Sequence, residues 1–405
     1  MFLYFRKNLV ITFLLGILSG LPLALSGSSL MILISEYGIN IEIIGLFALL
    51  GIPYTFKFLW APLLDICKIP LFTSALGHRK GTLAVINILM CLSIIIVGSI
   101  NPSENIIPIM IAAIALSSLS ASQDIIIDSM RIELLSEHEQ AGGATMISSG
   151  YRIGMLITSA GALSLTSFLS WSTTYSIAAI LCAILCFLII SLYPKQKEIR
   201  HKPLSITESF IQPFKELLKR PNIASIVLFI IFYKLSDAYS QSLLSIFLLD
   251  NDYTKLDIAT VVKTFGVFAT FAGLFIGGYI GEKLSLKRYL TIGLVIQMLS
   301  NFAYISIIYM EGSITALLIV ISLENICGGI STAAFVSYIS LLCNKQFTAS
   351  QYSFLSALAS FGRTTISASA GFVIAYTGWA FFFIITAVMS LPALFLINKS
   401  IKNSH

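Results

Sequence analysis

Apolar residues fill this chain in long runs, and short joints between the runs collect most of the polar and charged side chains. A helix rises about 1.5 Å per residue, so about 20 apolar residues cross a bilayer core about 30 Å thick. Twelve runs are long enough, and we predict a spanning helix for each: 9–34, 41–64, 82–101, 106–134, 143–169, 172–193, 223–249, 258–281, 287–309, 313–342, 350–376 and 379–397. The pattern predicts an all-α integral membrane protein.

The composition agrees with this pattern, because 57% of the 405 residues are hydrophobic and only 11% are charged. The first run could also belong to a cleaved signal peptide, since Arg6 and Lys7 precede it and Ala24-Leu25-Ser26 resembles a cleavage site. The run continues well past that site. We therefore expect an uncleaved first helix.

The charges of the joints alternate in sign along the chain. Lys and Arg gather at the N-terminus, after the second, sixth and eighth predicted helices and in the C-terminal tail, whereas Asp and Glu mark the intervening joints. Cytoplasmic loops carry the excess of Lys and Arg, so both termini should be cytoplasmic, which requires an even number of helices. The net charge of +6 comes from dispersed bases, which argues against nucleic-acid binding.

One long polar stretch, residues 194–222, contains seven Lys or Arg residues and four prolines. We interpret it as a cytoplasmic linker with a short amphipathic helix over 206–218 that lies on the membrane surface. The linker would join a six-helix half at 1–193 to a second six-helix half at 223–405.

The two halves also repeat each other in sequence. Leu18 and Leu235, each followed by Ser, are 217 residues apart, and the same interval separates Asp65 from Glu282. A parallel duplication of this kind is the organisation of major facilitator transporters, which hold their substrate between two pseudo-symmetric halves near the midplane.

The joint after the eighth predicted helix, GYIGEKLSLKR at 278–288, resembles the loop signature of major facilitator transporters. Its glycines let helices approach closely, and its acid and bases can form an ion-pair latch. The first-half copy departs from this pattern, because Pro62 replaces the leading glycine and the loop is longer. The alternative is that these bases only anchor the topology. The candidate gating residues are Asp65, Arg79, Lys80, Asp128, Arg131, Glu282, Lys283, Lys287 and Arg288.

Several charged residues lie inside the predicted helices. A charge at the centre of a membrane helix costs about 2.5–3.5 kcal/mol on insertion scales, so it needs a partner or a water-filled cavity. Asp124, Asp128 and Arg131 are spaced by four and three residues and share one helix face with Ser117 and Ser120. This helix should therefore have a polar side, on which Asp128 and Arg131 could form a static brace.

Three acids in the predicted helices are candidates for proton coupling: Asp124, Asp237 and Glu324. A poorly solvated carboxylate is suited to take up and release a proton. Lys234 and Asp237 are three residues apart and can neutralise each other when no substrate is bound. Static ion pairing is the alternative for Asp237 and Glu324.

The bases in the predicted helices are candidates for substrate binding. A guanidinium presents a planar fork to a carboxylate, so Arg152 and Arg363 are expected to hold anionic groups. Lys57 could bind substrate, extend to the membrane surface or brace the helices.

Enzyme chemistry has little support in the sequence. All four histidines, His78, His138, His201 and His405, fall in predicted loops or at the terminus, and no two are four residues apart. Neither a metal site nor a histidine base inside the membrane is expected, and no cofactor is implied. No glycine-rich phosphate loop follows a strand, which argues against an ATP-driven pump, and the six cysteines follow no disulfide spacing.

Longer motifs resemble a known transporter family. They are GLPLAL (20–25), FKFLWAP (56–62), ASQD (121–124), GYRIGM (150–155), YKLSDA (233–238), ENICGG (324–329) and LCNK (342–345). Together they resemble the bacterial anhydromuropeptide permeases, the AmpG type, over nearly the whole chain. One departure is His78, which stands where the family usually has another basic residue.

The resemblance implies a proton-driven importer in the bacterial inner membrane. Its cargo would be GlcNAc-1,6-anhydroMurNAc and the peptide-bearing forms, returned from the periplasm for cell-wall recycling, and the family is linked to β-lactamase induction. Gln123 and Asn325 would bind the hydroxyl and acetamido groups of the sugars, beside the bases Lys57, Arg152, Lys234 and Arg363. We expect a monomer.

Three other interpretations remain open. Acetyl-CoA transporters share the same family shape but would need clustered bases for several phosphates, and the bases here are spread over different helices. A membrane-embedded lipid-modifying enzyme would need a convergent base and nucleophile, which the sequence does not offer. A sensor of wall fragments would bind this cargo without pH-dependent uptake, and a related carrier could take another sugar or peptide conjugate.

Overall fold

The computed structural model describes residues 2–39, 47–66, 69–194, 206–310, 312–367 and 369–401, and every regular element within these ranges is a helix. Nine of the described helical stretches are long and apolar enough to cross a membrane: Lys7–Glu36, His78–Ser99, Ile106–Leu134, Trp171–Leu192, Ile223–Asp250, Thr260–Lys283, Leu286–Ile307, Ile314–Leu342 and Ala370–Ile401. The prediction of an all-α membrane protein is confirmed, and the count of twelve spans stays a prediction.

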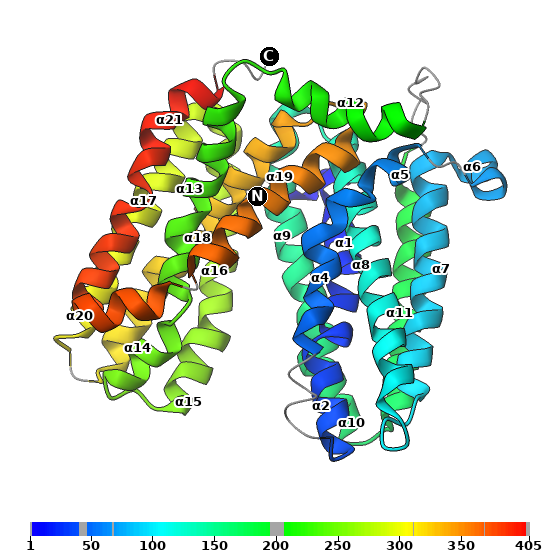
Figure 1. Cartoon of the computed structure of the whole chain (residues 1–405), viewed down its shortest axis with the longest axis horizontal. Helices are drawn as coiled ribbons and strands as arrows, with labels where there is room; N and C mark the ends of the chain where they lie inside the picture. The colour runs from blue at the N-terminus through cyan, green and yellow to red at the C-terminus, as the bar shows by residue number, and fades with distance from the viewer. Residues whose placement is uncertain are drawn as a thin grey trace. The chain divides into compact units, whose positions relative to one another are not determined.

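The chain forms two compact units (Figure 1). Unit 1 contains Met1–Ser136, Met146–Phe214 and Cys343–Ser353, and unit 2 contains Glu137–Thr145, Lys215–Leu342 and Phe354–His405. Each unit is built mainly from one half of the sequence but includes a short segment of the other half. The boundaries predicted at 193 and 223 stay a prediction.

The helices of unit 1 are α1 (Lys7–Ser26), α2 (Ser28–Glu36), α4 (Ile52–Phe56), α5 (Ala61–Ile66), α6 (Pro70–Leu76), α7 (His78–Ser99), α8 (Ile106–Leu134), most of α9 (Gln140–Leu156), α10 (Ala162–Thr166) and α11 (Trp171–Leu192). Shorter helical turns are η1 (Phe2–Phe5), η2 (Phe47–Gly51), η3 (Lys57–Leu59) and the π-helix η5 (Ile157–Gly161). Helix α12 (Ile206–Leu218) has the bounds predicted for the amphipathic linker helix.

The helices of unit 2 are α13 (Ile223–Gln241), α14 (Leu244–Asp250), α15 (Lys255–Asp257), α16 (Gly266–Lys283), α17 (Leu286–Ile307), α18 (Ile314–Leu342), most of α19 (Thr348–Ser367), α20 (Ala370–Val388) and α21 (Leu391–Ile401). The turn η4 (Glu137–Glu139) and the π-helix η6 (Ile258–Phe265) also belong to it. The helix predicted over 350–376 is interrupted, because α19 ends at Ser367 and α20 begins at Ala370, whereas the predicted boundary between 376 and 379 falls at the kink of α20 at Gly378.

The first spanning helix of each unit is broken. In unit 1 the break is at Gly27, whose φ of −119° and ψ of −107° are not helical, between α1 and α2. In unit 2 the break is at Ser242 and Leu243, between α13 and α14. Each first helix therefore has a long segment before its break, α1 or α13, and a short terminal segment after it, α2 or α14. The two segments can be oriented separately.

Helices α1 and α9 cross in very close contact. Gly16 and Gly20 on α1 face Gly150 and Gly154 on α9, and a side chain at any of these positions would collide with the backbone of the other helix. Small residues four apart let two membrane helices approach in this way. The crossing fixes the position of Ser19 on α1 relative to α9.

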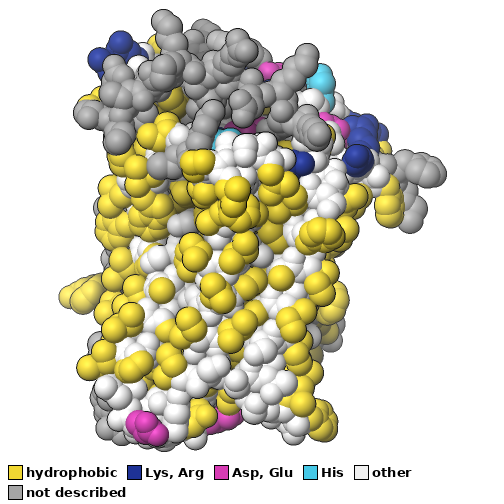
Figure 2. Space-filling model, turned by 90° about the vertical axis from the view of Figure 1, so that its right-hand side faces the viewer, with side chains coloured by type: hydrophobic (Ala, Val, Ile, Leu, Met, Phe, Trp, Pro, Cys, Tyr) yellow, Lys and Arg dark blue, Asp and Glu magenta, His cyan; other side chains and the backbone are white. Residues whose placement is uncertain are grey.

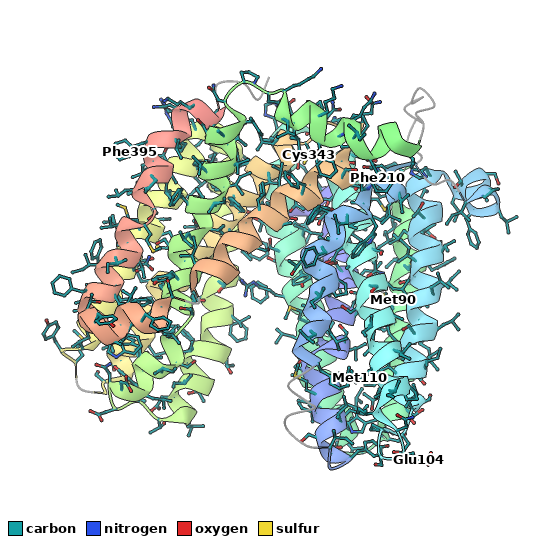
Figure 3. All side chains as sticks on the ribbon, in the orientation of Figure 1. Met90, Glu104, Met110, Phe210, Cys343 and Phe395 are labelled. Carbon is teal, nitrogen blue, oxygen red and sulfur yellow. The ribbon has the colours of Figure 1, made fainter. Side chains whose placement is uncertain are left out.

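The outer surface of unit 1 has the chemistry of a lipid-facing surface. Figure 2 shows hydrophobic side chains over the face that carries α7 and α11, with Lys and Arg near one end only, where some Asp and Glu also lie, and Asp and Glu without bases at the other end. Phe168 and Phe187 are 88% and 74% exposed. So much exposed apolar surface indicates contact with lipid rather than water. We call the two ends of unit 1 the basic end and the acidic end; Glu104 lies at the acidic end (Figure 3).

Candidate functional site

The polar face predicted for the fourth spanning helix lies on α8 in unit 1. Asp124 is 9% exposed, and its carboxylate accepts a hydrogen bond from the Ser19 hydroxyl of α1 at 2.5 Å. Lys57 Nζ lies 3.9 Å from Asp124 Oδ2. The structure therefore brings together two predicted site residues, and it supplies a base that sequence spacing along α8 did not reveal.

The segment before Lys57 lines the same face of α8. The Tyr54 hydroxyl donates to Ser120 Oγ at 2.6 Å, and the Trp60 indole donates to Ser122 Oγ at 3.0 Å. The Ser117 hydroxyl donates to the backbone carbonyl oxygen of Leu50. The broken helical segment from η2 to α5 is thus bonded to three serine hydroxyls of α8, through a phenol, an indole and a backbone carbonyl.

Gln123 is bonded to α7 and not to the Asp124 site. Gln123 is fully buried, and its amide donates to Asn87 Oδ1 on α7 at 3.1 Å. Arg152 is half-buried on α9, in the same helix as the glycines that contact α1. Gln123 thus joins α8 to α7.

In unit 2, the predicted pair on α13 forms. Lys234 Nζ lies 3.1 Å from Asp237 Oδ2 and donates to Thr332 Oγ1 on α18 at 3.0 Å. The ammonium group also lies 6.0 Å from the centre of the Phe335 ring. The two charged side chains are 20% and 25% exposed, so both are largely but not fully shielded.

Glu324 on α18 is bonded to neutral amide and phenol groups and also interacts electrostatically with the Asp237 carboxylate. It is 2% exposed, and the Gln297 amide donates to its carboxylate at 3.4 Å. The side chains of Gln241 and Tyr304 also hydrogen-bond to it. Among the side chains that the structure describes, no Lys or Arg lies within 4.0 Å of this carboxylate. Glu324 is therefore a buried acid held by amides and a phenol.

Asn325 and Arg363 are the other two binding residues predicted in the second half, and the structure describes the side chain of Asn325 only. The Asn325 amide donates to Ile321 O at 2.9 Å, and its carbonyl oxygen accepts from the Thr270 hydroxyl at 2.8 Å. Asn325 therefore joins α18 to α16. Arg363 falls within α19, but its side chain lies outside the described residues.

Asp65 and Arg79 are brought together near the basic end of unit 1. Arg79 Nη2 lies 2.8 Å from Asp65 Oδ1 and 2.7 Å from Glu133 Oε1. Asp65 is 8% exposed and Arg79 is 9% exposed. This buried cluster of one base between two acids includes Glu133, which sequence reasoning did not select.

The start of α19 is bonded to the same cluster. The Ser350 backbone N–H and hydroxyl donate to Asp65 Oδ2 at 3.0 and 2.6 Å, and the Ala349 N–H donates to Asp65 Oδ1 at 3.3 Å. The Thr348 hydroxyl donates to Glu133 Oε1 at 2.6 Å. The N-terminus of a helix carries free N–H groups and a partial positive charge, so a carboxylate there is stabilised.

Asp128, Arg131 and Lys80 make separate contacts. Arg131 is fully buried; its Nη2 lies 3.6 Å from Asp128 Oδ1, and its guanidinium lies 5.2 Å from the centre of the Tyr352 ring. Lys80 Nζ donates to the backbone oxygens of Ile190 and Tyr193 at 3.2 and 2.9 Å. Lys80 therefore caps the C-terminal end of α11.

The second-half loop is built differently. Glu282 and Lys283 lie in the last turn of α16, and the Lys283 ammonium lies 4.2 Å from the centre of the Tyr279 ring. Lys287 and Arg288 are exposed in the first turn of α17. The bases of this loop therefore point into solvent.

Three residues of the buried cluster that the sequence predictions missed, Thr348, Ser350 and Glu133, do have a signal in the sequence. Thr348 and Ser350 open a helix after a polar joint, which is typical of helix N-termini. Glu133 lies two residues after Arg131 at the end of an apolar run, where a third charge needs a partner. The Ser19 contact with Asp124 had no signal in the spacing of residues, because it joins positions 105 residues apart.

The chain was compared with known families and proteins. The model of the Major Facilitator Superfamily matches residues 12–259 and 235–403. The chain is 38% identical over 401 residues to "Putative transporter AmpG 4" of Rickettsia felis, covering 96% of each. It is 34% identical over 389 residues to "Anhydromuropeptide permease" of Escherichia coli K12, covering 96% of this chain and 78% of that protein.

Solved structures agree on the fold. The crystal structure of FucP, a major facilitator transporter in the outward conformation, matches with a TM-score of 0.71 and 14% identity over 98% of this chain and all of that chain. The human organic anion transporter MFSD10 matches with a TM-score of 0.69 and 13% identity over 97% of this chain and 99% of that chain. At such low identity these likenesses concern the fold alone.

Proposed function

Because the chain belongs to the Major Facilitator Superfamily, among its AmpG-type transporters, we propose that it imports GlcNAc-1,6-anhydroMurNAc and its peptide-bearing forms together with protons. The observation that carries this proposal is the similarity to an anhydromuropeptide permease along almost the entire chain. Transport would run from the periplasm to the cytoplasm across the bacterial inner membrane, with both termini in the cytoplasm.

The chemistry of the buried side chains fits such a cargo. A muropeptide offers peptide carboxylates, an amine and many hydroxyl groups. In unit 1, Lys57, Tyr54 and Asp124 place a base, a phenol and an acid beside one another. In unit 2, Lys234 and Asp237 offer both charges within 3.1 Å. We propose that these groups exchange their present partners for the groups of the cargo, and that Arg152 and Arg363 also bind it.

Two of the predicted sugar-binding residues take a different role in this proposal. The amide groups of Gln123 and Asn325 are already bonded to Asn87 and to Thr270 and Ile321. Breaking such buried hydrogen bonds costs about 1–3 kcal/mol for each group left unsatisfied. We propose that Gln123 and Asn325 hold their helices in position, and that the cargo binds mainly to the charged groups.

Glu324 is our first candidate for the transported proton, with Asp124 and Asp237 as the others. A buried carboxylate without a neighbouring base is stabilised in its neutral form, and its amide and phenol neighbours can donate to the charged form. Asp124 and Asp237 each have a lysine nearby, at 3.9 and 3.1 Å. We propose that these two acids act mainly as charged partners of their lysines.

We propose that the cluster of Asp65, Arg79 and Glu133 closes one side of the transporter. The cluster holds the start of α19 through Thr348 and Ser350, so the whole contact must break before that segment can leave unit 1. Alternating access requires a contact of this kind, which is strong when closed and exchangeable with water when open.

The experiment that tests the proposal is uptake of labelled GlcNAc-anhydroMurNAc-tripeptide into proteoliposomes, with and without an inward proton gradient. Excess unlabelled muropeptide, acetyl-CoA and a simple disaccharide serve as competitors. We expect uptake that the gradient stimulates and that only the muropeptide blocks. Inhibition by acetyl-CoA alone would assign the carrier to nucleotide thioesters instead.

Two further results would contradict the proposal. Uptake that is equal with and without the gradient would remove proton coupling. Binding of the labelled muropeptide without uptake, by protein that elutes as a single folded species, would indicate a sensor. The variant Lys399→Ala provides a matched control, because that lysine is exposed in the last turn of α21 and is not among the candidate gating or binding residues.

A further inference from the structure

Both units bond the terminal segment of their broken first helix to a tryptophan of their last spanning helix. In unit 1, the Trp171 indole donates to Glu36 Oε2 at 2.7 Å. Glu36 is the last residue of α2, and Trp171 is the first residue of α11. This bond therefore joins the end of α2 directly to the start of α11.

A second contact supports the bond in unit 1. Tyr175, one turn after Trp171, is fully buried and donates its hydroxyl to Leu25 O at 2.9 Å. Leu25 lies just before the break at Gly27, where the helix no longer supplies all of its own hydrogen bonds. The ring of Trp171 lies 6.1 Å from the ring of Tyr175 in an edge-on arrangement. Helix α11 thus contacts the first helix on both sides of its break.

Unit 2 contains the matching bond. The Trp379 indole donates to Asp250 Oδ2 at 3.1 Å. Asp250 is the last residue of α14, and Trp379 follows the kink of α20 at Gly378, where φ is +75°. One turn later, Phe383 packs against Phe247 of α14 with ring centres 4.8 Å apart. Apolar ring packing here takes the place of the tyrosine hydroxyl of unit 1.

The two bonds occupy matching places in the repeated sequence. Asp250 follows Glu36 by 214 residues, and Trp379 follows Trp171 by 208 residues, close to the 217-residue interval of the other repeated positions. The residues around them differ, since α2 reads SSLMILISE and α14 reads LSIFLLD. The chain has three tryptophans, and the third, Trp60, donates to a serine hydroxyl inside unit 1.

We propose that Glu36 with Trp171, and Asp250 with Trp379, are pairs of positioning residues for transport. Each pair holds a short terminal segment, α2 or α14, in a fixed orientation relative to the break beside it. An indole N–H is a single donor, so each pair adds one directional bond at the far end of a segment that is otherwise held by packing and, in α2, by the bond of Ser29 to Thr158 O. When the bond opens, the segment turns about Gly27 in unit 1 or about Ser242 and Leu243 in unit 2.

This inference rests on the contacts within each unit and not on the cargo, so it can fail or succeed independently of the proposed function. The test is hydrogen–deuterium exchange of the full chain in lipid nanodiscs, followed peptide by peptide. Trp171→Phe, Trp379→Phe and Trp60→Phe each remove one indole N–H and keep an aromatic ring. We compare backbone exchange in α2 and α14 with exchange in α7 as an internal reference.

We expect Trp171→Phe to speed exchange in α2 about tenfold and to leave α14 unchanged, because a hydrogen bond to a charged group contributes about 1.5 kcal/mol or more. Trp379→Phe should speed exchange in α14 alone, by a smaller factor, since its bond is longer and more exposed. Trp60→Phe should change neither segment. Unchanged exchange in both segments, or equal acceleration by Trp60→Phe, would overturn the proposal.

A second set of variants covers the case in which Trp171→Phe does not fold. Glu36→Gln keeps a side-chain oxygen that can accept from the indole, whereas Glu36→Ala removes it. We expect faster exchange in α2 for Glu36→Ala and near-normal exchange for Glu36→Gln. In the double variant Glu36→Ala/Trp171→Phe, exchange in α2 should be no faster than in Glu36→Ala alone, because both changes remove the same hydrogen bond. Equal acceleration by both Glu36 variants would contradict the assignment.

Discussion

Asp65 and Glu282 stand at matching positions of the repeated sequence, yet the two units surround them differently. The Asp65 carboxylate is buried and bonded to Arg79 and to the start of α19. Glu282 is half-buried at the end of α16, and the bases that follow it, Lys287 and Arg288, are exposed. One copy of the loop is therefore a buried ionic cluster, whereas the other carries its two following bases at the surface.

The difference shows that likeness to a loop signature does not predict where the stronger contacts form. The second-half loop matches the signature better in sequence, and we expected the latch to be weaker in the first half. The longer first-half loop, however, folds into α6 and delivers Arg79 to the first turn of α7, between Asp65 and Glu133. Charges gain most from pairing where water is excluded, so the first-half cluster should be the more important one for closure.

The largest expected effect is that of Arg79→Leu. This change leaves the carboxylates of Asp65 and Glu133 buried without their base, and breaking a buried ion pair in this way costs about 3–5 kcal/mol. We expect a marked loss of thermal stability in the purified protein, measured by loss of the monodisperse peak after heating. The matched change Arg288→Leu removes an exposed arginine of the other loop and should alter the stability by about 0.5 kcal/mol or less. Similar losses of thermal stability in Arg79→Leu and Arg288→Leu would refute the contrast between the buried cluster and the exposed arginine.

The next largest effect concerns the deep acids of the two units. Glu324→Gln keeps the shape and the hydrogen-bonding capacity of the side chain but cannot take up a proton. The coupling free energy between two ligands of one protein, here the proton and the cargo, is typically about 1–3 kcal/mol. Losing this coupling should lower the stimulation of uptake by a proton gradient by about 5- to 150-fold. Uptake down a cargo gradient, without a proton gradient, should continue in the variant.

Asp124→Asn provides the comparison in unit 1. Lys57 lies 3.9 Å from Asp124 and already serves as its charged partner, so we expect the variant to keep part of the proton stimulation. Both variants are assayed in the same proteoliposomes at matched protein content. Full stimulation in Glu324→Gln, with none left in Asp124→Asn, would move the proton site to unit 1.

The spanning helices were largely predictable from the sequence because each depends on the residues of its own segment and of the joints beside it. Runs of about 20 apolar residues and alternating joint charges indicate spanning helices whatever their partners are. The breaks were not predictable in the same way. Gly27 and Ser242 lie inside runs that satisfy the same hydropathy rule, and the breaks depend on contacts such as that of Tyr175 with Leu25.

The candidate site was predictable only where its partners share a helix. The pairs Lys234 with Asp237 and Asp128 with Arg131 follow from their spacing, and both form. The contacts of Asp124 with Ser19 and Lys57 join different helices, so helical periodicity along α8 carries no information about them. For the same reason the sequence did not separate Gln123, which faces Asn87, from its neighbour Asp124.

The smallest expected effect is that of reversing the charge of Glu282, which is half-buried at the end of α16 beside the exposed bases Lys283, Lys287 and Arg288. Glu282→Lys places a further positive charge beside Lys283, Lys287 and Arg288, and repulsion among exposed charges is worth up to about 1 kcal/mol. If this loop moves during the cycle, the maximal rate of uptake should fall by about fivefold at most, with an unchanged KM. Glu282→Gln removes the charge without reversing it and should give a smaller decrease, which separates repulsion from the loss of a specific contact. A change in KM at a constant maximal rate would instead mean that the loop affects binding of the cargo, and the gating role would then belong to the buried cluster of unit 1 alone.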